Sequence, residues 1–190
     1  MKTLKRREWL TKALGALGVV TLGRTALRAK PPERRFATEF GADWELAKAY
    51  TLEVAEAMPA EKYDFKPSAE MRSFGELMAH TAGAMFRFAS GVRGERPGVA
   101  PPKEPTKEAV VAFLRGACDY VAESVAQIDD TRAEQSIKLF GGRLEMPVWK
   151  LFHFLRDHTT HHRAYGLPYL RLCGVQPPRY RFSGTRPSPV

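Results

Sequence analysis

The segment that decides the fold is PVWKLFHFLRDHTTHHRAYGLPYLRLCG, residues 147–174. Its apolar residues and two of its histidines recur at alternating spacings of three and four, which is typical of the inward face of a packed helix. This face comprises Val148, Leu151, Leu155, His158, His162, Tyr165, Tyr169 and Leu172. Pro147 suits a first helical turn and Gly174 a helix end. We therefore expect one long amphipathic helix, which Pro168 should kink or deprive of one hydrogen bond.

Three further helices are predicted upstream, at about residues 38–58, 73–91 and 106–125, because each carries an apolar stripe at helical spacing. Ser73, with Glu76 three residues later, has the spacing of a capping box at the start of the second of these helices. Gly141–Gly142 lies between short apolar runs and predicts a hairpin-like connection before the last helix. Four amphipathic helices with loops between them predict an all-α protein, a four-helix bundle.

The net charge of +9 is concentrated at the N-terminus of the 190-residue chain. Residues 1–35 hold ten Lys and Arg against two acids, so they carry +8, and residues 36–190 carry only +1. A protein that binds a nucleic-acid groove needs its positive charge on the folded body. The distribution therefore argues against nucleic acid as a partner.

The N-terminal segment MKTLKRREWLTKALGALGVVTLG has the architecture of a signal peptide. Its apolar run, residues 13–23, is too short to span a bilayer, and the pair Arg6–Arg7 followed by Trp9 resembles a twin-arginine export signal. We expect a leader at 1–35, a folded body at 36–180, a flexible tail at 181–190 and an exported, periplasmic location. Membrane contact is expected only through an uncleaved leader. A basic N-terminal helix that is never removed is the alternative.

His158 and His162 are one helical turn apart and face the same way, so both can bind one ion. His80, at the edge of the apolar face of the second helix, supplies a third candidate ligand if the helices meet. The alternative is a purely structural pair of histidines, hydrogen-bonded to carboxylates or tyrosines. Position 159 is Thr, so the segment is not an HExxH protease motif. His153 and His161 are expected on outward or flanking surfaces.

Three stretches together resemble the DinB-like (DinB/YfiT) family of metalloenzymes. They are AMPAEKYDFKPSAEMRSFGELMAHTAG at 57–83, HTTHHRAY at 158–165 and LRLCGVQPPRY at 170–180. The resemblance covers about residues 36–180 and implies a four-helix bundle that binds a divalent metal through His80, His158 and His162. Tyr165 stands where the family often has Gln, which affects the surroundings of the site rather than its ligands. Export is unusual for this family.

Three nitrogen ligands suit a divalent Zn, Ni or Fe ion and leave one coordination position open. A water there is acidified towards a pKa of about 7, and a thiol is deprotonated outright. Some members of the family are thiol-dependent transferases, so the resemblance implies transferase or hydrolase chemistry on a small-molecule substrate, with a thiol as one candidate. A non-catalytic metal-binding or interaction bundle is the alternative. Related bundles often dimerise, so a homodimer is a further possibility.

Several other side chains have two interpretations each. Glu76 and Asp157 either orient a ligand imidazole or are ordinary solvated charges. Tyr165 either donates a hydrogen bond towards the open position or packs in the core, and Arg163 either holds an anionic substrate or covers apolar surface. Cys118 and Cys173 are either two small buried residues or, in an exported protein, one disulfide.

Overall fold

The computed structural model describes residues 32–95 and 97–181. In chain order these form α1 (Arg35–Ala57), the short 3-10 turn η1 (Ala60–Lys62), α2 (Phe74–Arg93), α3 (Lys107–Ala126), α4 (Asp130–Glu134), β1 (Ser136–Leu139), β2 (Leu144–Pro147) and α5 (Val148–Leu172). No helix in this part of the chain is long and apolar enough to cross a membrane. Residues 1–31 of the expected leader and residues 182–190 of the expected tail lie outside the described residues.

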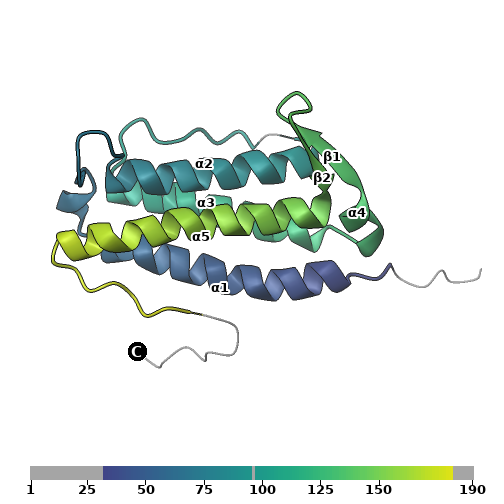
Figure 1. The fold of residues 1–190 in the computed structure, drawn as a ribbon, viewed down its shortest axis with the longest axis horizontal. Coiled ribbons are helices and arrows are strands. Elements are labelled where there is room, and N and C mark those ends of the chain that lie inside the picture. Colours follow the sequence, from purple (N-terminus) through teal and green to yellow (C-terminus); the bar gives the residue numbers. More distant parts are fainter. Residues whose placement is uncertain (1–31, 96, 182–190) are drawn as a thin grey trace, which may run out of the picture. The chain divides into compact units, whose positions relative to one another are not determined.

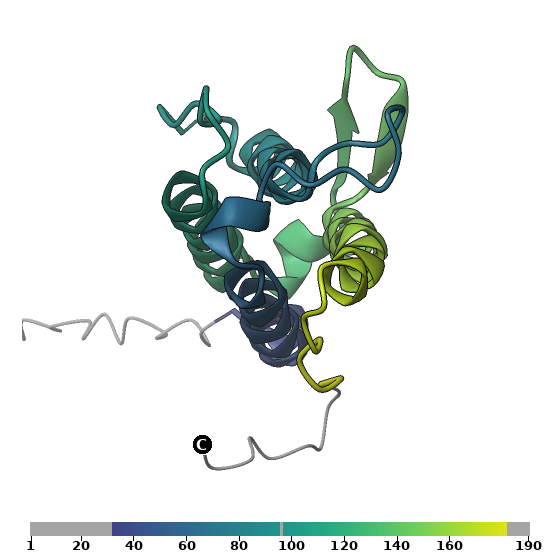
Figure 2. The ribbon, with the colours of Figure 1, turned by 90° about the vertical axis from the view of Figure 1, so that its left-hand side faces the viewer.

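The four long helices pack as a bundle, which confirms the predicted all-α class (Figure 1). Seen along the helices, they surround one core, with α2 beside α3 and α5, and α1 beside the same two helices (Figure 2). The strands β1 and β2 form an antiparallel hairpin in which Leu139 pairs with Leu144, just before α5. Because α2 and α5 are neighbours, His80 can meet the histidines of α5.

The helix starts follow from local hydrogen bonds that satisfy free backbone N–H groups. At α2, the Glu76 N–H donates to the Ser73 hydroxyl at 3.1 Å, and the Ser73 N–H donates to the Glu76 carboxylate at 2.7 Å. This confirms the predicted capping box. At α3, the Thr106 hydroxyl accepts from the Ala109 N–H. Gly94 ends α2 in the left-handed conformation, with φ of 75°.

The core consists of the inward faces of the four long helices. The predicted stripes of α2 and α3 are buried, namely Phe74, Leu77, Met78, Thr81, Met85 and Phe86 on α2 and Val110, Phe113, Leu114, Ala117, Val121 and Val125 on α3. Trp44 of α1 is fully buried, and its indole N–H donates to the Cys118 carbonyl at 3.1 Å. Both cysteines are free, and burial raises the pKa of Cys118 to about 12, so that residue is a small core side chain.

The predicted inward face of α5 is correct at Val148, Leu151, Leu155 and Tyr169 and wrong at Tyr165 and Leu172. Tyr165 and Leu172 are 51% and 64% exposed, whereas Gly166 and Leu170 are buried. The alternating spacing averages 3.5 residues per turn, and a straight helix has 3.6, so the predicted face drifts by about 20° per heptad. Over three heptads the drift carries Tyr165 and Leu172 out to solvent. The helix continues through Pro168, whose ring is itself exposed.

Candidate metal centre

The structure brings His80, His158 and His162 together between α2 and α5. The Nε2 atoms of His158 and His162 are 3.1 Å apart. The ring of His80 lies 4.7 Å from that of His162 and 5.6 Å from that of His158, measured between centroids. One nitrogen from each of the three rings lies within 4.8 Å of the others. Side chains from positions far apart in the chain therefore converge, whereas the helical spacing predicted only that His158 and His162 face the same way.

The three histidines lie at the rim of the core rather than inside it. Each is partly exposed, and the buried side of α5 runs instead through Leu155, Thr159 and Arg163. The prediction that His158 and His162 occupy core positions on the seam is therefore wrong, for the same reason of helix pitch that displaces Tyr165. Phe88 of α2 covers one side of the group, with its ring 6.0 Å from that of His158. A rim position leaves the group open to small molecules.

Partial burial keeps the three imidazoles neutral. Desolvation is the main cause that lowers the pKa of His162, to about 4, and the neighbouring His158 and His80 lower it further. Burial also lowers the pKa of His80, with Arg72 and Arg87 adding to the shift. Neutral imidazoles offer nitrogen lone pairs, which is the form that binds metal ions.

The donor atoms fit a divalent transition metal. Two nitrogens bound tetrahedrally at about 2.1 Å from zinc are separated by about 3.4 Å, near the 3.1 Å between the Nε2 atoms of His158 and His162. Imidazole suits zinc, nickel and iron. Within the described residues, the cluster contains three histidines and no carboxylate. The set therefore corresponds to a site with three protein ligands, which leaves a further position for a water or a substrate.

The predicted supporting residues do not contact the three imidazoles. Glu76 is engaged by the Ser73 N–H and by Lys66, whose Nζ is 3.3 Å away. Asp157 is exposed and lines a hollow between α1 and α5. Neither carboxylate forms a hydrogen bond to the three imidazoles in the described part of the chain. Tyr165 faces solvent beside His161, with the ring centroids 4.8 Å apart, so its predicted place on the inward seam is wrong.

Arg163 follows His162 in sequence, but its side chain lies on the side of α5 that packs against α1. Its side chain is 6% exposed and points towards α1. The guanidinium donates to the Thr51 hydroxyl at 3.2 Å and lies 4.6 Å from the centre of the Tyr50 ring. Arg163 therefore joins α5 to α1 and is not placed to hold a substrate at the histidines. His153 packs on the flank, 5.3 Å from the Phe40 ring, and His161 is exposed, as expected.

Cavities next to the histidines were not predicted from the sequence. A cavity of about 310 Å³ is lined by His80 together with Arg87 and Lys103. A larger one of about 770 Å³ adjoins it, because Gly83, Arg87 and Pro101 line both. One signal was available, since Arg87 lies seven residues after His80 and therefore on the same helix face. The loop residues could not be placed from sequence spacing.

Comparisons with known proteins agree with this architecture. Residues 43–165 match the sequence profile of the DinB superfamily. A DinB-like protein from Bacillus cereus superposes with a TM-score of 0.68 at 18% identity, covering 76% of this chain and 97% of its own. A DinB-like protein from Bacillus subtilis gives a TM-score of 0.62 at 17% identity, covering 75% and 96%. A conserved protein from Enterococcus faecalis gives 0.58 at 14% identity, covering 72% and 95%. No curated protein sequence matches the chain.

Proposed function

This chain belongs to the DinB superfamily, and from that premise we propose that His80, His158 and His162 bind one divalent metal ion in a metal-dependent enzyme. The observation that carries the proposal is the convergence of three imidazoles from two helices, two of them with Nε2 atoms 3.1 Å apart. Their pKa values are lowered, which suits metal binding at neutral pH. Zinc, nickel and iron are the expected ions.

The proposed reaction class is transferase or hydrolase chemistry on a small molecule, with a thiol as the candidate co-substrate. When bound, the ion supplies Lewis acidity, which acidifies a water or deprotonates a thiol. The chain's own part is to fix three ligands on two packed helices, and to shield one side of them with Phe88. The cavity beside His80 gives a small molecule access to this position.

A second candidate function is a non-catalytic bundle in which the metal is structural. Structural zinc sites are usually closed by four protein ligands, whereas catalytic sites keep one position open. The three-histidine group and the adjoining cavity favour the catalytic reading. Cobalt-loaded protein separates the two, because an added thiol such as 2-mercaptoethanol should change the visible spectrum only if a position can be exchanged.

The metal site is tested by metal content and by titration of Zn²⁺ into the metal-free protein. We expect one equivalent in the wild type and a loss of affinity on the order of a hundredfold or more in His158→Ala, since one of three ligands is gone. His161→Ala is the matched control, because it removes an exposed histidine three residues away on the same helix. Equal metal content in His158→Ala and the wild type would end the assignment.

Export by the twin-arginine route is proposed for the N-terminal segment, with a periplasmic location for the folded body. The support is the paired Arg6–Arg7 before a short apolar run. That route carries folded proteins, so a metal could be inserted before transport. Replacing both arginines with lysine should keep the protein in the cytoplasm, and continued export of that variant would reject the proposal.

A homodimer is proposed as a further state and is tested by light scattering.

A further inference from the structure

Two basic side chains beside the histidines have no acidic partner within the described residues. Arg87 and Lys103 line the cavity next to His80, and neither forms an ion pair there. The cavity's one carboxylate belongs to Glu76, which is held by Lys66 and by the Ser73 N–H. Unpaired cations in a hollow attract anions. The positive charge of these two side chains therefore favours a negatively charged ligand in the cavity.

The larger cavity, which adjoins these basic residues, has an apolar wall. It is lined by Phe86, Val99 and Phe140, and Arg87 lies where it joins the smaller cavity. Its other charged side chains are engaged, Lys138 by Glu145 at 3.6 Å and Glu95 by Arg93 at 2.7 Å. Arg87 is therefore the basic side chain that lines both cavities and has no acidic partner among the described residues.

Aromatic contacts connect this wall to the histidines. The ring of Phe140 meets the edge of Phe88 at 5.9 Å between centroids, and Phe88 meets His158 at 6.0 Å. Phe140 is 44% exposed and has a φ of 53°, in the left-handed region that bulky side chains rarely adopt. Strained backbone of this kind gathers at functional sites, because the surrounding structure must hold it in place. The hairpin thus places an exposed phenyl ring at the cavity, although the left-handed backbone of Phe140 is unfavourable for this residue type.

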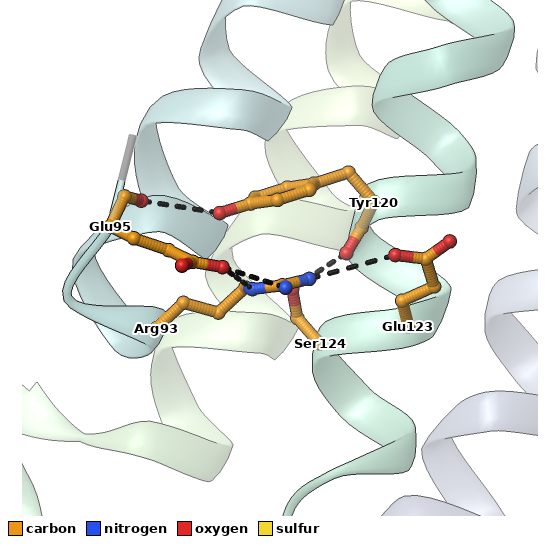
Figure 3. Close-up of polar contacts among 5 residues, drawn as sticks. All are labelled: Arg93, Glu95, Tyr120, Glu123 and Ser124. Carbon is orange, nitrogen blue, oxygen red and sulfur yellow. Dashed lines mark hydrogen bonds and ion pairs between the residues drawn. The ribbon is translucent and has the colours of Figure 1, made fainter. Parts of the chain in front are cut away.

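The loop that carries the facing wall is anchored at its start. Arg93, the last residue of α2, binds the Glu95 carboxylate, and its guanidinium lies 4.5 Å from the centre of the Tyr120 ring (Figure 3). The Tyr120 hydroxyl donates to the Glu95 carbonyl at 3.2 Å (Figure 3). These contacts hold the chain at Glu95, at the edge of the larger cavity.

We propose that the metal centre takes a small carboxylate with an apolar body, held by Arg87 at its carboxylate and by Phe140 and Val99 along its body. The inference rests on the proposed metal site and names the substrate class of that site. A divalent ion held by three neutral imidazoles keeps its full charge, because none of the ligands is anionic. Arg87 adds to this positive field, so an anionic ligand balances the charge.

The test uses the full chain loaded with Co²⁺ and its visible absorption as the readout, with phenylacetate as the probe. Phenylacetamide is the neutral analogue, and acetate is the carboxylate without the ring. We expect phenylacetate to bind about tenfold more tightly than phenylacetamide, and Arg87→Gln to abolish this preference. Arg171→Gln is the matched control, because it removes an exposed arginine at the far end of α5 and should leave the preference intact. Thermal melts establish that both variants are folded.

A second variant tests the apolar wall. Phe140→Asn removes the ring, and Asn tolerates the left-handed backbone, so the hairpin is kept. Phenylacetate should bind several-fold more weakly to this variant, while acetate binding is unchanged. No binding of phenylacetate, or equal binding to the wild type and Arg87→Gln, would overturn the inference and leave the metal site standing. Absence of bound cobalt in the wild type would overturn the metal site, and the inference with it.

Discussion

The contact between α2 and the loop before α3 can be tested with the substitution Gly75→Ala, which adds one methyl group. A Cβ atom added at Gly75 would lie 2.7 Å from the Pro105 carbonyl oxygen and 3.1 Å from the Tyr63 ring. The Gly75 N–H also donates to the Tyr63 carbonyl at 2.8 Å, so the helix cannot move away freely. The oxygen belongs to backbone, which adjusts less easily than the end of a side chain. Gly75→Ala should therefore force α2 and the loop apart.

The magnitude follows from two opposing effects. Overpacking in a tight contact costs about 1–3 kcal/mol, and replacing Gly by Ala in a helix returns about 0.5–1 kcal/mol. We expect Gly75→Ala to lower the free energy of unfolding by about 1–2 kcal/mol. Gly83→Ala, on the same helix, meets nothing within 4 Å and should raise the free energy of unfolding by about 0.5–1 kcal/mol.

Urea unfolding followed by circular dichroism measures both variants, with the midpoint and the slope compared to the wild type. The opposite sign of the two changes is the decisive outcome, because helix propensity alone would make both variants more stable. If Gly75→Ala is as stable as Gly83→Ala, the loop does not press on α2 and the packing described for this end of the bundle is refuted.

Three further predictions concern α5. Arg163→Ala should lower the free energy of unfolding by about 2–3 kcal/mol, because it removes the hydrogen bond to Thr51 and the contact with the Tyr50 ring, and chemical denaturation measures this. Tyr165→Phe should leave both the stability and the zinc affinity unchanged, since the hydroxyl faces solvent; a weaker zinc affinity in titration calorimetry would restore Tyr165 to the site. The metal-free protein should lose about 1–2 kcal/mol between pH 7 and pH 4, after allowance for partial exposure of His162. The pKa of His162 is about 4 in the folded state and about 6.5 in the unfolded state, so the unfolded state binds more protons in this window. Urea titrations of wild type and His162→Gln measure this, and an unchanged pH dependence in the variant would contradict it.

The helices and their starts could be predicted because local signals agree with the final packing. Ser73 and Thr106 cap helices through side chains only three residues from their partners, and the apolar stripes of α2 and α3 are long and regular. The hairpin was predictable from Gly141–Gly142, which have φ values of 67° and 86°. The short helix α4 was missed, because five residues carry no periodicity that can be recognised.

The histidine group was predictable in part, and its surroundings were not. The spacing of His158 and His162 placed them on one side of one helix, but only the packing of α2 against α5 could bring His80 to them. The alternating spacing has a period of 3.5 residues, whereas the helix has 3.6 residues per turn, so the predicted face departs further from the buried face along the helix. The role of Arg163 was missed because contact with Tyr50 of α1 depends on which neighbour each flank of α5 faces.

Gly166 has a consequence for the tuning of the histidine group. It lies one turn beyond His162, and a Cβ atom there would stand 3.2 Å from Met78 and 3.4 Å from Val54. Met78 belongs to α2, the helix that also carries His80, so its side chain packs against α5 at the bare Cα of Gly166. A methyl group added at Gly166 would press on Met78 of α2 and Val54 of α1, and so would change how closely α5 packs on these helices. The spacing of the three imidazoles can thus be altered from a position outside the group.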